Sequence, residues 1–143
     1  MANASNTVEI VRPPAAVYAF LADGLNNPKW RPGVLEIALA SGTAGAEGAV
    51  YSQKIKGPMG AVPGDYRLAE ARPHARIRFE VVAGPARPTG VFEIAPTERG
   101  TRLTFTLSLE PKGLMRLMNG VIQKTMESEV ANLARLKEVL ERT

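Results

Sequence analysis

From residue 34 to residue 110 the chain alternates apolar and polar side chains with a period of two, the pattern of half-buried β-strands. The clearest run is 102–109, where Leu103, Phe105, Leu107 and Leu109 share one face. Turn clusters rich in Gly and Pro separate the runs, and such short connections imply antiparallel pairing. With a weaker alternation at residues 7–11, the pattern predicts a sheet of about seven strands with one dry face and one wet face.

The dry face of this sheet is expected to carry apolar and aromatic side chains from five further runs. These are Leu35, Ile37 and Leu39; Tyr51, Gln53 and Ile55; Val62, Gly64, Tyr66 and Leu68; Ile77, Phe79 and Val81; and Phe92 and Ile94.

Helical spacing appears at both ends of the chain. Residues 15–22 predict a short helix opened by Pro13 and Pro14, and residues 26–32 form a turn or a second short helix. From 113 to 141 apolar residues recur at intervals of three and four, which predicts an amphipathic helix that would be about 43 Å long if continuous. Asn119-Gly120 is the expected kink, because glycine weakens a helix interior.

The predicted elements are poorly matched in width, which bears on function. Strands about 4.8 Å apart make a sheet roughly 30 Å wide, whereas one helix is about 10–12 Å across. The sheet must therefore curl around the long helix, and we expect an apolar cavity near the short helices, suited to a small molecule. The alternatives are a sandwich or a sheet covered by a partner, without a cavity.

Composition narrows the possible chemistry. The 143 residues fit one domain spanning 1–143, and 45% of them are hydrophobic. With no cysteine and His74 as the only histidine, disulfides, a cysteine nucleophile and a multi-histidine metal site are excluded. No phosphate loop or dinucleotide fingerprint is present, so no metal or cofactor is expected. The start lacks a signal-peptide pattern and the apolar runs are too short for a membrane span, which predicts a cytoplasmic protein.

The formal net charge of +4 is dispersed along the chain rather than clustered. From 65 to 102 basic and acidic residues alternate, which favours a mixed solvated face over a nucleic-acid stripe. The alternating residues are Arg67, Arg72, Arg76, Arg78, Arg87, Arg99 and Arg102 with Asp65, Glu70, Glu80, Glu93 and Glu98. No nucleic-acid partner is therefore expected.

Several motifs, spread over nearly the whole chain, resemble one superfamily. They are Ile10-x-x-Pro13-x-x-x-Val17-Tyr18-x-x-Leu21-x-Asp23, Asn27-Pro28-Lys29-Trp30-x-Pro32, and the segments 48–53, 70–73, 100–105 and 132–137. The sequence is similar to the SRPBCC superfamily, which joins START lipid-binding domains, plant pathogenesis-related allergens and aromatic polyketide cyclases/dehydrases, and most resembles the bacterial cyclase/dehydrase branch. The resemblance implies an α+β helix-grip fold: a curved antiparallel sheet around a long C-terminal helix, with two short helices after the first strand.

Polar and aromatic residues on the expected dry face are candidates for ligand binding. Trp30, the only tryptophan, lies where the resemblance places the cavity entrance, although it could simply anchor the short helices. Gln53 needs a neighbour, a water or a ligand if buried, and the hydroxyls of Tyr51 and Tyr66 could reach the same space. The remaining candidates are Phe79, Phe92, Phe105, Met118, Ile122 and Met126.

Glu129 is the anomaly of the C-terminal helix, because its spacing places it on the apolar stripe. A buried carboxylate there could act as a general acid or base. The simpler interpretation is that the stripe shifts at the kink and Glu129 reaches solvent or an arginine. His74 follows a proline in a turn and is expected to be exposed and inert, Asp23 to cap or pair locally, and Asp65 to lie on the wet face.

Three functions fit these observations. The first is a binding protein that encloses a hydrophobic or aromatic small molecule, lipid or polyketide-like. The second is a polyketide cyclase or dehydratase that uses Glu129, Tyr51, Tyr66 or Gln53. The third is a partner-binding module, which requires an exposed apolar patch or clustered charge that the sequence does not clearly show. A homodimer is left open.

Overall fold

The computed structural model describes residues 2–57 and 59–143. It contains β1 (Ala2–Ile10), α1 (Pro14–Ala22), η1 (Gly24–Lys29), β2 (Val34–Ser41), β3 (Val50–Gly57), β4 (Gly60–Pro63), β5 (Tyr66–Arg72), β6 (Arg76–Val81), β7 (Thr89–Pro96), β8 (Thr101–Leu109), η2 (Gly113–Met118), α2 (Asn119–Ala131) and α3 (Leu133–Glu141), where η denotes a 3-10 helix. The expected order of strand, two short helices, strands and C-terminal helix is confirmed.

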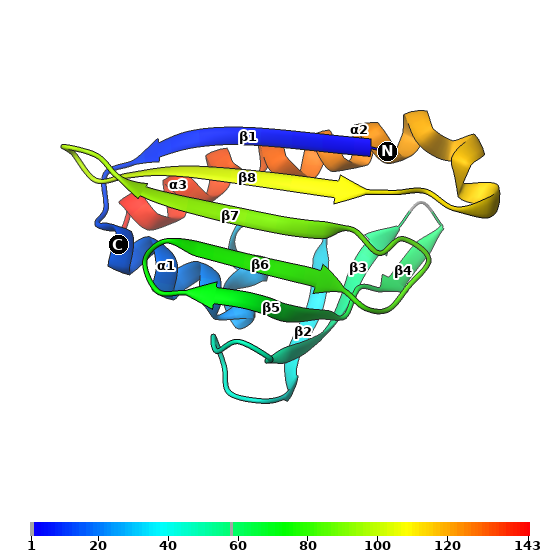
Figure 1. Cartoon of the computed structure of the whole chain (residues 1–143), viewed down its shortest axis with the longest axis horizontal. Helices are drawn as coiled ribbons and strands as arrows, with labels where there is room; N and C mark the ends of the chain where they lie inside the picture. Colours follow the sequence, from blue (N-terminus) through cyan, green and yellow to red (C-terminus); the bar gives the residue numbers. More distant parts are fainter. Residues whose placement is uncertain (1, 58) are drawn as a thin grey trace.

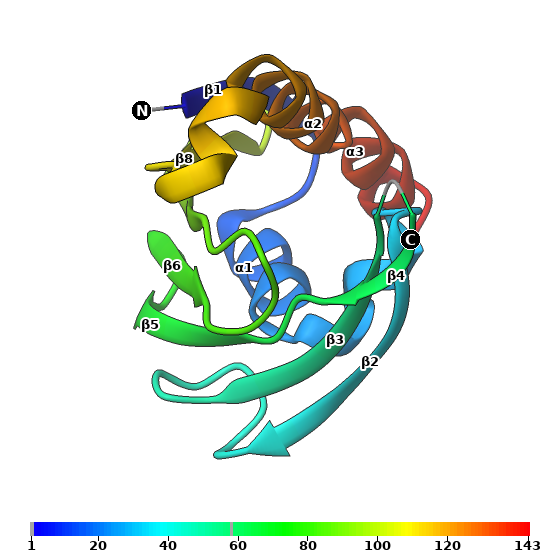
Figure 2. The same ribbon diagram turned by 90° about the vertical axis from the view of Figure 1, so that its right-hand side faces the viewer.

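The strands form one curved antiparallel sheet in the order β1-β8-β7-β6-β5-β3-β2, with β4 paired to β3. The first strand therefore lies beside the last, with Ala2 opposite Leu109 and Ile10 opposite Thr101. Figure 1 shows the long strands in front of the helices, and Figure 2 shows the sheet curling around them. The α+β helix-grip fold predicted from the sequence is thus present, with eight strands rather than about seven.

Side-chain alternation predicted the buried faces of most strands. Leu103, Phe105, Leu107 and Leu109 are all buried in β8, as expected. β2 is an exception, because Leu35 and Leu39, expected on the dry face, are largely exposed. The pairing of β2 with β3 shifts register between Val34 and Glu36 and again between Leu39 and Ser41, so the regular alternation is interrupted at these two leucines.

The C-terminal segment differs from the single long helix that was expected. A 3-10 helix ends at Met118 where the kink was predicted, and a second interruption at Asn132 separates α2 from α3. α2 packs on β1 and β8, while α3 packs on β1. The apolar stripe is fully buried only from Met126 onward: Met115 and Ile122 pack partly against the core, while most of η2 and the first turn of α2 project beyond the sheet.

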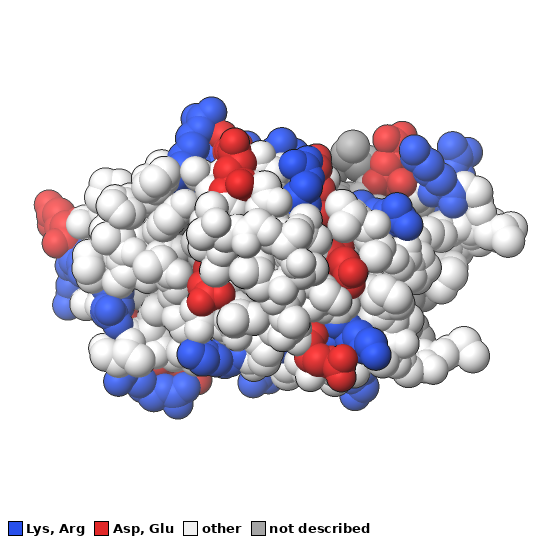
Figure 3. Space-filling model, turned by 90° about the horizontal axis from the view of Figure 1, so that it is seen from below, with Lys and Arg blue, Asp and Glu red and all other residues white. Residues whose placement is uncertain are grey.

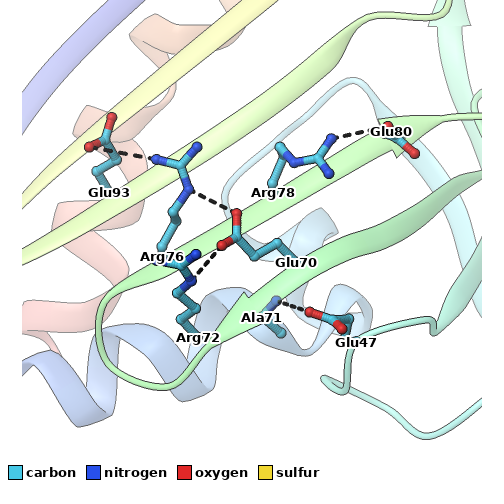
Figure 4. Close-up of polar contacts among 8 residues, drawn as sticks. All are labelled: Glu47, Glu70, Ala71, Arg72, Arg76, Arg78, Glu80 and Glu93. Atoms are coloured by element: carbon cyan, nitrogen blue, oxygen red, sulfur yellow. Dashed lines mark hydrogen bonds and ion pairs between the residues drawn. The ribbon is translucent and has the colours of Figure 1, made fainter.

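Alternating charges cover the outer face of β5, β6 and β7, as the sequence predicted (Figure 4). Glu70 accepts from Arg76 at 3.0 Å, and Arg78 pairs with Glu80 at 3.0 Å. Hydrogen bonds from Arg67 and Arg78 hold the pKa of Glu80 below its usual value. Exposed pairs of this kind contribute at most about 1 kcal/mol each, so their main effect is to keep this face solvated.

No helix within residues 2–57 and 59–143 is long and apolar enough to cross a membrane.

Candidate functional site

The concave face of the sheet carries a cluster of aromatic rings beneath the short helices. Phe92 and Phe105 stack with ring centroids 4.4 Å apart. Trp30 meets both edge-on, at 6.1 and 6.2 Å, and Phe79 lies 6.0 Å from Phe92. Such geometries add to the stability gained by burial. The sheet and the segment after η1 are therefore joined through Trp30.

A small internal cavity lies against this cluster, at the position predicted from the sequence. Its volume is about 20 Å³, enough for about one water molecule. It is lined by Leu21, Asn27, Trp30, Arg31, Tyr66, Leu68, Ile77, Phe79 and Phe92. The expected ligand-sized space is thus largely filled, because the aromatic side chains themselves occupy the hollow of the sheet.

Three polar side chains bind one another at one side of this cavity. The Asn27 amide donates to the Tyr66 hydroxyl at 2.9 Å and to the Gln53 side-chain oxygen at 3.3 Å. The Gln53 amide donates to the Gly64 carbonyl at 3.2 Å. The need of Gln53 for a neighbour, predicted from its place in the strand, is therefore met by the protein itself.

Tyr51 and Tyr66 form the wall behind these groups. Their rings stack at 5.3 Å, and the Tyr51 hydroxyl accepts from the backbone N–H of Gly45 at 3.0 Å. Gly24 passes very close to this pair: a Cβ at Gly24 would lie 2.1 Å from the Tyr66 oxygen. The absence of a side chain at Gly24 is what lets η1 rest on the tyrosines.

Burial raises the pKa of the Tyr66 hydroxyl well above its usual value. In an alkaline titration followed by phenolate absorbance, we expect a late-ionising tyrosine that is missing in Tyr66→Phe. Because unfolded Tyr66 ionises near pH 10, this group's contribution to stability is intact below that pH and is lost as the pH rises further. An unchanged titration curve in Tyr66→Phe would contradict the assignment.

Trp30 is almost fully buried, and its indole N–H has no hydrogen-bond partner among the described residues. An unpaired buried donor costs roughly 1–3 kcal/mol. Trp30 also lines the cavity, beside Arg31. Trp30 therefore anchors the segment after η1 on the sheet, which is the packing role expected for it. Its buried N–H is in addition a hydrogen-bond donor without an acceptor among the described residues.

Glu129 projects from α2 to Arg31, with 3.0 Å between the Arg31 Nε and the carboxylate. Both side chains are mostly buried, at 14% exposure for Arg31 and 26% for Glu129. The simpler interpretation of Glu129, that it reaches an arginine, is the one the structure supports. The ion pair joins α2 to Arg31, which lines the cavity, so it holds α2 against the segment after η1.

The other candidates are spread along α2 and its approach. Met126 is buried and Ile122 is partly buried against the core, whereas Met118 is 48% exposed at the start of α2. His74 is exposed and lies edge-on to Tyr18 at 5.8 Å. Asp23 caps η1 by accepting from the Leu25 N–H.

One expectation about an acidic residue needs correction. Asp65, expected on the wet face, is half-buried and accepts from the Gln53 backbone N–H at 3.1 Å. Asp65 lies between the end of β4 at Pro63 and the start of β5 at Tyr66, where the strand is interrupted. From this position its carboxylate reaches the Gln53 N–H of β3.

Sequence reasoning missed three residues of this region: Gly24, Asn27 and Arg31. Asn27 and Arg31 come within reach of Gln53, Tyr66 and Glu129 only when η1 folds onto the sheet. The one sequence signal that could have led to Asn27 was the buried amide expected at Gln53, because such an amide requires a polar neighbour. Within the described ranges no group of three or more His, Cys, Asp or Glu side chains is placed to hold a metal ion.

A curled sheet gripping C-terminal helices, with an aromatic and polar interior, defines a helix-grip protein. The family model for "Polyketide cyclase / dehydrase and lipid transport" matches residues 1–141. The chain belongs to this family, which confirms the resemblance seen in its motifs. No curated protein matches the chain in sequence.

Solved structures of distant sequence share the fold. A START superfamily protein from Mycobacterium smegmatis is 16% identical with a TM-score of 0.78, covering 99% of both chains. The di-domain ARO/CYC StfQ from the steffimycin biosynthetic pathway is 15% identical with a TM-score of 0.77, over 99% of this chain and 50% of that one. A protein from Thermus thermophilus is 22% identical with a TM-score of 0.74, over 97% of this chain and 95% of that one.

Proposed function

We propose that this protein binds an apolar small molecule that carries an oxygen acceptor, lipid or polyketide-like, in the hollow between its sheet and the segment formed by α1, η1 and residues 30–31. The observation that carries the proposal is the buried indole N–H of Trp30, unpartnered among the described residues and beside an aromatic cavity. A carbonyl or ether oxygen on an otherwise apolar ligand would satisfy this donor while the rings of Phe79 and Phe92 contact the rest. Family membership supports the same class of ligand.

The cavity must widen to admit such a molecule, because about 20 Å³ holds only a water. The seam that we expect to open runs between α2 and residues 30–31, where the Arg31–Glu129 ion pair spans it. The ion pair lies in the last turns of α2, between the buried Met126 and Val130, so opening this seam costs free energy that ligand binding must supply. The ligand-bound form is then an open state that is less populated without ligand.

The test compares two probes of nearly the same shape, acetylnaphthalene with a carbonyl oxygen and isopropylnaphthalene without one. We expect the protein to bind acetylnaphthalene more tightly, by roughly 0.5–1.5 kcal/mol or about two- to tenfold in Kd, for one added hydrogen bond. Trp30→Phe keeps an aromatic ring but removes the N–H, so it should bind the two probes equally. Calorimetry on both proteins measures the difference.

Two results would contradict the proposal. One is that neither probe binds the unmodified protein. The other is that Trp30→Phe keeps the preference for acetylnaphthalene, which would place the acceptor elsewhere. Phe20→Tyr on α1, at a half-buried site away from the cavity lining, serves as the matched aromatic control and should leave both affinities unchanged.

A second candidate function is cyclisation or dehydration of a poly-ketone chain. The observation in its favour is that Arg31 and the Tyr66 hydroxyl line the same cavity as Trp30, so donors surround any carbonyl held there. Glu129 is the candidate base, with Arg31 keeping its carboxylate in place. Liquid chromatography with mass spectrometry of a short poly-ketone incubated with the protein separates the two functions. A carrier returns the poly-ketone unchanged, whereas an enzyme returns a cyclised isomer of the same mass or, after dehydration, a product lighter by one water.

A further inference from the structure

Four large apolar side chains stand exposed on η2 and the first turn of α2. Leu114 and Leu117 are 84% and 85% exposed, and Met118 and Val121 are about half exposed. We call residues 112–124 the apolar tip. An exposed apolar cluster of this kind marks a contact surface, and it was not evident from the sequence, where these residues were counted with the buried stripe.

The apolar tip is also basic. Lys112, Arg116 and Lys124 lie among its apolar residues, and residues 111–126 contain no Asp or Glu. All three are exposed, and within the described part of the chain no carboxylate lies within 4.0 Å of any of them. The balanced pairing of charges on the outer face of the sheet is therefore not repeated here.

The β3–β4 hairpin also carries an exposed apolar side chain and an exposed basic side chain, and it lies at the same end of the molecule as η2. The turn between β3 and β4 carries Met59, fully exposed, next to the exposed Lys56. Figure 1 shows the β3–β4 hairpin and η2 at the same end of the molecule, and Figure 2 shows them on opposite sides of that end. In Figure 3 the outermost atoms at the right-hand end of the molecule are uncharged, and both basic and acidic side chains lie behind them.

We propose that the apolar tip docks the protein on an anionic lipid surface, with Leu114, Leu117 and Val121 entering the headgroup region and the three cations contacting lipid phosphates. The three cations favour a lipid surface as the partner of the tip, because a bilayer with acidic lipids offers both an apolar layer and dense negative charge. A second copy of this chain would bring the same cations against each other. The docking goes beyond the proposed ligand binding and does not depend on it.

The test is flotation of the full chain with vesicles of phosphatidylcholine alone, or of phosphatidylcholine mixed equally with phosphatidylglycerol. We expect binding to the anionic vesicles, little binding to the neutral ones, and weakening of the bound fraction as salt is raised. Leu114→Glu/Leu117→Glu should lower the affinity for anionic vesicles at least about tenfold, and so should Lys112→Gln/Arg116→Gln/Lys124→Gln.

Matched variants elsewhere on the surface control for net charge. Val11→Glu/Leu25→Glu makes the same change at exposed positions outside the tip, and Arg72→Gln/Arg99→Gln/Arg102→Gln removes three exposed cations from other loops and strands. Both should bind anionic vesicles within about twofold of the unmodified protein. Circular dichroism and the fluorescence of Trp30 verify that each variant is folded.

Three results would overturn the proposal. The first is no binding to anionic vesicles. The second is a loss in the control variants equal to that in the tip variants, which would indicate general electrostatic attraction. The third is a concentration-dependent dimer, seen by sedimentation, that Leu114→Glu/Leu117→Glu abolishes without any change in vesicle binding; this would assign the tip to a second copy of the chain.

Discussion

Phe105→Ala is expected to lower the free energy of unfolding by about 3–5 kcal/mol, a large share of the roughly 5–15 kcal/mol typical of a domain. Phe105 is 1% exposed and contacts the rings of Phe92, Phe79 and Trp30, so its removal leaves a hole that three large neighbours cannot easily fill. Urea unfolding followed by Trp30 fluorescence measures the loss.

The same variant should gain a binding site for a small apolar molecule. Benzene at saturating concentration is expected to restore part of the lost stability in Phe105→Ala and none in the unmodified protein, whose cavity is too small. Phe20→Ala makes the same deletion on half-buried α1 and should cost less than half as much. A loss at Phe105 no larger than at Phe20 would mean that the aromatic cluster is not central to the core.

Gly24→Ala is expected to destabilise the protein by roughly 2–4 kcal/mol, although alanine normally favours a helix over glycine. The new methyl would overlap the Tyr66 oxygen at 2.1 Å and the Tyr51 ring at 2.9 Å. Either η1 moves off the sheet or Tyr66 turns away, and both break the hydrogen bond from Asn27. Thermal and urea unfolding provide the measurement.

Gly120→Ala is the matched control, since a Cβ at Gly120 meets nothing within 4 Å. In α2 this change should raise the stability by up to about 1 kcal/mol, through helix propensity alone. Equal effects of the two substitutions would refute the steric argument at Gly24.

Period-two alternation was enough to identify the buried residues of β8, because this strand lies inside the sheet, between β1 and β7, and one of its faces is covered. The same rule was wrong for Leu35 and Leu39, since alternation along the sequence cannot reveal the register shifts that interrupt β2 beside them. Helical spacing likewise identified the C-terminal helices but could not show that Leu114 and Leu117 extend beyond the sheet.

The candidate site was predicted in part. Tyr51, Gln53, Tyr66 and the three phenylalanines do converge on one interior, as their shared face implied. The pairing of Arg31 with Glu129 joins residues 98 positions apart and has no local signature. The filling of the cavity also escaped prediction, because sheet width and helix diameter set the space between elements but not the volume of the side chains inside it.

The pairing of β1 with β8 constrains when this protein can fold during its synthesis. β1 is made first, yet its hydrogen-bonding partner is complete only when Leu109 has been added, and α2 and α3, which cover it, are made last. Until then the backbone N–H and C=O groups of β1 have no strand to pair with, and the sheet of the emerging chain lacks its β1–β8 pairing. Shielding of β1 by a chaperone, or fast translation of residues 101–141, would favour a good yield of the native protein.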